Sequence, residues 1–167
     1  MQTIARGIAF SDLMFLSKPR IIATAVFQSP GGVALVDPGP TTCVDTLKTE
    51  LAAQGIAVAD IRSVLLTHIH LDHAGVTGTL CLENPKIKVY VHERGAPHMA
   101  DPTKLLASAK QLYGDDMDRL WGDFLAVPQD NVHVLRGGER ISLGDRELEV
   151  AYIPGHASHH VGFLDRS

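Results

Sequence analysis

Cysteine is scarce in this sequence: Cys43 and Cys81 are the only two, and they form no Cys-x-x-Cys pair. Two distant cysteines do not define a disulfide framework. The longest purely apolar run, Ile21–Phe27, is far shorter than the roughly 18 to 20 residues that a membrane-spanning helix needs. Asp12 interrupts the only apolar stretch near the start, which argues against a secretory signal. We therefore expect a cytoplasmic protein with no membrane partner.

The sequence also lacks a basic excess. Its 15 Lys and Arg stand against 19 Asp and Glu, which gives a net charge of −4. A basic balance that would recruit nucleic acid is absent, so no nucleic-acid partner is expected. The 45% of hydrophobic residues over a length of 167 are enough for one real core. We therefore treat residues 1–167 as a single domain.

The order of secondary structure predicts an α/β (α+β) fold with a mixed sheet covered by helices. A helix is expected from Thr41 or Thr42 to Gly55 and another from Ala74 to Leu82. Residues 93–125 differ in character and predict helices around 103–113 and 116–125. Strands are expected at 21–27, 32–36, 63–67, 88–91, 132–135, 139–142, 148–153 and 161–164.

What the sequence has in excess is histidine, with nine in the chain. Three of them, His68, His70 and His73, fall with Asp72 inside six residues, directly after an apolar strand. Residues two apart on an extended chain project to the same side, so His68 and His70 can grip one cation together. Asp72 and His73 follow where the chain turns into a helix, and they can reach a second cation nearby. The alternative is a polar loop whose histidines cap the helix and face solvent.

The run His68-Ile-His-Leu-Asp-His73 resembles the signature of the metallo-β-lactamase superfamily. Asp37-Pro-Gly39 resembles the Asp-x-Gly that ends an early strand in that family, and Pro154-Gly-His156 resembles its later Pro-Gly-His. The resemblance covers about residues 20 to 165 and implies an αββα sandwich, incomplete at the C-terminus. Residues 93–125 would then be the family's variable helical insertion.

The resemblance implies two divalent metal ions, with zinc favoured and iron or manganese as alternatives. His68, His70 and His156 would form one metal site, and Asp72 and His73 would contribute to the second. Asp72 would also orient a metal-bound hydroxide that attacks the substrate, which makes it the catalytic residue. We expect Asp37 to orient a ligand histidine, although a plain turn role for it is nearly as good an interpretation.

The remaining histidines and aromatic residues carry weaker predictions. His160 could touch substrate or support a ligand, but a structural or solvent-facing role is favoured for it and for His159. Tyr113 and Trp121 are expected to pack the helices of residues 93–125 rather than to form a substrate box. That segment could still act as a lid over a pocket.

Two further metal ligands of the family pattern, a bridging aspartate and a final histidine, have no counterpart in the chain. Asp165 follows an apolar strand, but it takes the place of an ordinary turn residue. A C-terminal segment of a longer protein, or a second chain, would then complete the fold. A natural, degenerate half that binds metal but does little catalysis is the remaining explanation.

The leading functional hypothesis is a metal-dependent hydrolase of a small ester, thioester or lactone. Its partner would be a small-molecule substrate, as in glyoxalase II-like and lactonase-like members of the family. One alternative is an iron-dependent oxidoreductase similar to the persulfide dioxygenases. Another is a non-catalytic metal-binding fragment.

Overall fold

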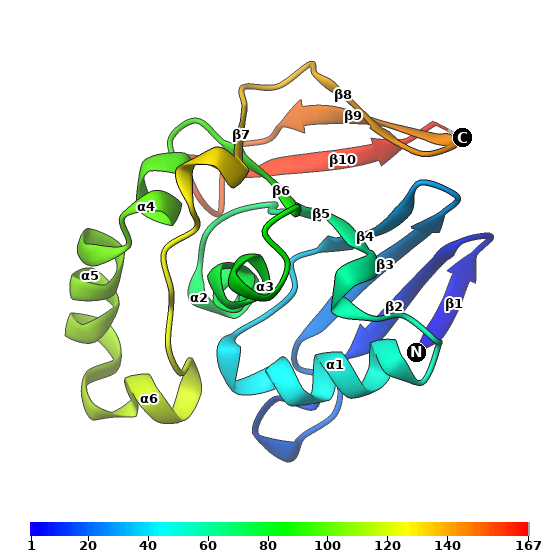
Figure 1. Cartoon of the computed structure of the whole chain (residues 1–167). Coiled ribbons are helices and arrows are strands. Elements are labelled where there is room, and N and C mark those ends of the chain that lie inside the picture. The colour runs from blue at the N-terminus through cyan, green and yellow to red at the C-terminus, as the bar shows by residue number, and fades with distance from the viewer. Residues whose placement is uncertain (167) are drawn as a thin grey trace.

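Two β-sheets face each other in the computed structural model, which describes residues 1–166 (Figure 1). The larger sheet has seven strands in the order β1-β2-β3-β4-β5-β6-β7, and the smaller has three in the order β10-β9-β8. Strands β1 to β4 pair antiparallel, whereas β4 to β7 pair parallel. The strands are β1 Gln2–Ala5, β2 Ile8–Asp12, β3 Ala23–Ser29, β4 Gly32–Val36, β5 Ile61–Leu65, β6 Lys88–His92, β7 Val132–Leu135, β8 Arg140–Leu143, β9 Arg146–Tyr152 and β10 Val161–Asp165.

Side chains of the central strands alternate between two cores, because successive residues of a strand point to opposite faces. Leu35 and Val64 point into a core that they share with Leu47 of helix α1 and Leu80 of helix α3. Ala34 and Leu65, next to them in sequence, point into a second core with residues of β8, β9 and β10. The described residues therefore form three layers, helices, large sheet and small sheet, as expected for part of an αββα sandwich.

Short helices join the strands. The α-helices are α1 Val44–Ala52, α2 Leu71–Ala74, α3 Thr77–Glu83, α4 Ala96–Ala100, α5 Thr103–Tyr113 and α6 Met117–Leu120. Single 3-10 turns are η1 Phe15–Ser17, η2 Thr41–Cys43, η3 Val58–Asp60, η4 Gly114–Asp116 and η5 Gln129–Asn131. In the described residues no helix is long and apolar enough to cross a membrane.

The predicted strands are all present with small shifts at their ends, but three elements were not predicted: β1, β2 and α4. The helix predicted from Ala74 to Leu82 is instead two short helices, α2 and α3. Helix α2 begins at Leu71, earlier than expected, so Asp72 and His73 lie on a helix rather than before one.

The prediction of a helix over residues 116–125 is wrong in its extent, because α6 ends at Leu120. Gly122 has a φ of +66°, which a helix cannot continue through. Two hydroxyls of η2 also donate hydrogen bonds to backbone carbonyls at the end of α6 and just after it. Thr42 donates to the carbonyl of Leu120, and Thr41 donates to that of Asp123. Helices α4 and α5 make up most of the earlier part of residues 93–125, and they lie with α6 at one side of the molecule (Figure 1). The status of this segment as an insertion stays a prediction, as does the single-domain assignment.

Candidate metal centre

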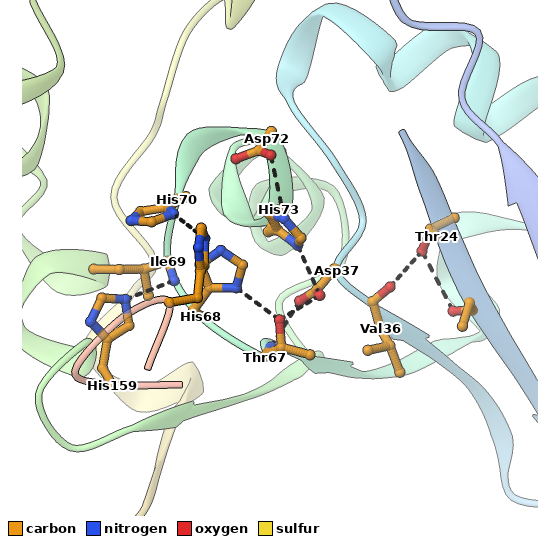
Figure 2. Close-up of polar contacts among 12 residues, drawn as sticks. Thr24, Val36, Asp37, Thr67, His68, Ile69, His70, Asp72, His73 and His159 are labelled. Carbon is orange, nitrogen blue, oxygen red and sulfur yellow. Dashed lines mark hydrogen bonds and ion pairs between the residues drawn. The ribbon is translucent and has the colours of Figure 1, made fainter. Parts of the chain in front are cut away.

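The parallel pairing of two strands places most of the predicted site residues at one edge of the large sheet. Strands β4 and β5 are parallel neighbours; Asp37 follows directly after β4, and Thr67 is the second residue after β5. Because the carboxyl ends of parallel strands meet at the same edge, these residues and the histidines after Thr67 come together (Figure 2). Ligands of open α/β sheets bind at this edge.

The carboxylate of Asp37 is the centre of a hydrogen-bond network. Its Oδ1 accepts from the backbone N–H of Thr67 at 2.8 Å. Its Oδ2 accepts from the Thr67 hydroxyl at 2.6 Å and lies 2.9 Å from Nδ1 of His73 (Figure 2). Asp37 thus links the chain after strand β5 to His73 of helix α2.

The network also orients His68. The Thr67 hydroxyl gives its only proton to Asp37, so its oxygen is left to accept a proton from Nδ1 of His68, 2.9 Å away. That tautomer leaves Nε2 of His68 with a free lone pair. His68 is buried, and this Nε2 has no hydrogen-bond partner in the described structure. Burial, followed by the neighbouring imidazoles, lowers the pKa of His68 to about 3, so the ring is neutral at ordinary pH.

His156 reaches this centre from the loop between β9 and β10. The loop is fastened at its end, because the N–H of Val161 donates to the carbonyl of Thr67 at 2.9 Å. Nε2 of His156 lies 3.1 Å from Nδ1 of His70, and both rings meet the His68 ring edge-on at 4.6 to 4.9 Å between centroids. Ligand atoms of His68, His70 and His156 all lie within 4.8 Å of one another. The structure therefore brings together the three residues predicted for the first metal site.

Asp72 and His73 lie next to this trio on α2. Nε2 of His73 lies 3.3 Å from a carboxylate oxygen of Asp72, and Nδ1 lies against Asp37. Burial lowers the pKa of His73, but the hydrogen bonds to Asp37 and Asp72 outweigh it and raise the pKa to about 9. Burial raises the pKa of Asp72, but its hydrogen bond to His73, the charge of His73 and a backbone hydrogen bond together lower it below its usual value. His73 therefore lies between two carboxylates, those of Asp37 and Asp72.

The second group of clustered ligand atoms shares only His73 with the expected pair of Asp72 and His73. It consists of Asp37, His68 and His73, with ligand atoms within 4.8 Å of one another. Asp72 is not in that group, and Asp37 stands in it. His160 is half-buried, with its ring centroid 5.0 Å from that of His68, so it borders the cluster.

Two residues of the site were not singled out in the sequence. Thr67 links Asp37 to His68 through its hydroxyl. Its position between the predicted apolar strand and the His-x-His run could have pointed to this role. His159, for which a structural or solvent-facing role was favoured, accepts a hydrogen bond from the N–H of Ile69 at 3.2 Å (Figure 2). Burial, followed by the neighbouring histidines, lowers the pKa of His159 to about 4, which keeps this nitrogen unprotonated and able to accept. Ile69 lies between His68 and His70, so His159 holds the backbone that presents both.

The donor set fits a transition-metal ion. Neutral imidazole nitrogens with a carboxylate nearby suit zinc, iron or manganese better than calcium or magnesium. The unpartnered Nε2 of buried His68 would be costly without a ligand, and a metal ion bound there would use its lone pair. The residues present therefore fit the cofactor that the resemblance implies.

A cleft of about 770 Å³ opens beside the centre. His70, Asp72 and His156 line it on one side, and α5 with Trp121 lines it on the other. Tyr113 and Trp121 were expected only to pack helices. They do contact each other, with ring centroids 5.2 Å apart, and Trp121 stacks on Phe15, but both also line this cleft.

The fold and the histidine centre define a metallo-β-lactamase-type protein. The pattern of the metallo-beta-lactamase superfamily matches residues 18–167, and the chain belongs to that superfamily. A crystal structure of the archaeal superfamily protein ST1585 from Sulfolobus tokodaii superimposes with a TM-score of 0.75 at 26% identity, over 97% of this chain and 61% of that one. TTHA1429 from Thermus thermophilus gives a TM-score of 0.74 at 26% identity, over 97% of this chain and 56% of that one.

Curated relatives include enzymes of two kinds. The chain is 30% identical to the N-acyl homoserine lactonase AttM of Agrobacterium fabrum, over 74% of this chain and 41% of that protein. It is 26% identical to the hydroxyacylglutathione hydrolase of Synechocystis, over 78% of this chain and 37% of that protein. The chain thus spans about two fifths of the length of these relatives.

Proposed function

We propose that this chain belongs to a metal-dependent hydrolase that cleaves a small ester, thioester or lactone. The proposal rests on one observation above all: buried His68 presents an unpartnered Nε2 to His70 and His156 at the carboxyl edge of the sheet. The lactonase and the hydroxyacylglutathione hydrolases among the relatives support the proposal that the substrate is a lactone or a thioester. The partner is a small molecule, with no nucleic acid or membrane involved.

His68, His70 and His156 would hold one divalent ion, and His73 with Asp72 would hold a second. Bound zinc would polarise a carbonyl and lower the pKa of water from 15.7 to around 7, which makes a nucleophile available at neutral pH. The chain's own residues prepare for this. Thr67 keeps His68 in the tautomer with a free Nε2, and Asp37 orients His73.

Asp72 takes the catalytic role in this proposal. Its side chain lines the cleft and lies beside Nε2 of His73, at the mouth of the centre. An ionised carboxylate in that place would orient a water molecule toward a carbonyl group bound in the cleft. The lowered pKa of Asp72 keeps it ionised.

The test is hydrolysis by the zinc-loaded chain of a panel of esters, thioesters and lactones, with metal content measured on the same samples. We expect turnover by the parent protein and near-background rates for His70→Ala and Asp72→Ala. His133→Ala, a change on β7 away from the centre, serves as the control and should keep the parent rate. Variants as active as the parent would contradict the proposal. One iron per chain with oxygen consumption would replace it with an oxidoreductase.

A further inference from the structure

The wall of the cleft opposite the histidines is an apolar stripe on α5. Leu105, Ala109 and Leu112 are spaced by four and three residues, which places them on one face of the helix. All three line the cleft; Leu105 and Ala109 are half-buried and also pack against the core, whereas Leu112 is exposed. Leu112 is 75% exposed, more than any other large apolar side chain in the described part of the chain.

The apolar surface that the stripe leaves open to the cleft, above all that of Leu112, would be stabilised by removal from water. The stripe faces a cleft whose other wall carries His70, Asp72 and His156. Trp121 and Tyr113 extend the apolar surface at its end. One ligand could therefore place an apolar part along α5 and its reacting part at the histidine centre.

The charged residues that line the cleft indicate which kind of ligand it could bind. Among the described residues that line it there is no Lys or Arg, and the one carboxylate there, that of Asp72, would repel an anion. Lys110 of α5 lines a different hollow on the other side of the helix. A glutathione thioester, whose peptide carries carboxylates, finds no cation in this cleft to pair with.

We propose that the stripe formed by Leu105, Ala109 and Leu112 binds an uncharged alkyl chain of the substrate. This inference rests on the proposed function for the reacting end of the molecule and adds the substrate class: esters or lactones that carry an aliphatic chain. The cleft volume of about 770 Å³ is within the usual range for a small-molecule site. Reacting groups on one wall favour a small ligand over a second protein copy, which would cover them.

Trp121 provides a direct measure of binding, because it is the only tryptophan in the chain and lines the cleft. We would titrate the purified chain, with and without zinc, with γ-lactones of increasing alkyl length and follow tryptophan fluorescence. Burial of one methylene contributes about 0.8 kcal/mol, which corresponds to about a fourfold fall in Kd per added CH₂. A Kd that does not change with chain length would overturn the inference.

The paired variants are Leu112→Asp and Leu82→Asp. Both replace exposed leucines of helices, at 75% and 64% exposure, but only Leu112 lines the cleft. Leu112→Asp should remove most of the chain-length dependence, and Leu82→Asp should leave it as in the parent. Equal effects of the two changes would count against the stripe. So would a parent dimer that Leu112→Asp alone converts to monomer in sedimentation, since the stripe would then be a self-association surface.

Failure of this inference and failure of the proposed function give different results. Chain-length-dependent binding without hydrolysis by the zinc-loaded chain would contradict the hydrolase and support the alkyl site. Hydrolysis at equal rates for short and long alkyl lactones would support the hydrolase and contradict the alkyl site.

Discussion

The Asp37 carboxylate lies 2.9 Å from Nδ1 of His73 while it accepts two hydrogen bonds from Thr67. One side chain from the end of β4 thereby orients two candidate ligands, His73 directly and His68 through the Thr67 hydroxyl. Partners of this kind set the tautomer and direction of metal-binding histidines.

Asp37→Asn should weaken zinc binding by about 10- to 100-fold, because an amide cannot accept all three hydrogen bonds. Competition with a chromophoric chelator measures this affinity. Asp130→Asn, an exposed aspartate in η5, is the matched control and should bind zinc as the parent does. Equal affinities for the Asp37 and Asp130 variants would show that Asp37 has only a turn role.

Thr67→Val should weaken zinc binding at His68, whereas Thr67→Ser should retain it. Valine matches threonine in shape but removes the hydroxyl that holds the tautomer of His68, and serine keeps that hydroxyl. The same chelator competition separates the two. If Thr67→Ser loses as much affinity as Thr67→Val, the methyl packing of Thr67 matters rather than its proton.

His159→Ala should lower the free energy of unfolding of the metal-free protein by about 1 to 3 kcal/mol, because the Ile69 N–H loses its acceptor. Urea unfolding followed by circular dichroism measures the change. His98→Ala, on α4, is the comparison and should cost less. A His159→Ala protein as stable as the parent would mean that water replaces the imidazole at no cost.

The two cysteine thiols should be inert in the native protein. Burial raises the pKa of Cys81 to about 11, and burial also raises that of Cys43. Since the thiolate is the reactive form, an aromatic disulfide reagent at about pH 8 should label neither until denaturant is added. Because the folded protein favours the neutral Cys81 thiol, its contribution to stability is present below about pH 9 and is lost as the pH rises toward 11. Rapid labelling without denaturant would contradict the buried placement.

Much of the site was predictable because its information is local. His68, His70, Asp72 and His73 lie within six residues after an apolar strand, and the strand-to-helix turn brings them together whatever the distant packing. The family resemblance added His156, which a loop far along the chain brings to His70. The strands were predictable for the same reason, since their apolar runs are local.

What could not be predicted depends on contacts between distant residues. The role of His159 requires knowing that the β9–β10 loop folds over Ile69. The end of α6 at Leu120 depends on hydroxyls from Thr41 and Thr42, about 80 residues earlier, as the separations of 82 and 78 positions show. The apolar cleft requires the distance between α5 and α2, which the helical period of α5 alone does not contain.

Zinc binding by the purified chain, measured calorimetrically with metal content on the same samples, tests the central claim most directly. We predict two zinc ions per chain for the parent protein and loss of at least one for His68→Ala and for His70→Ala, with a higher Tm only where zinc binds. A parent chain that binds no zinc, or variants that bind as much as the parent, would contradict the assignment of this cluster as a metal centre.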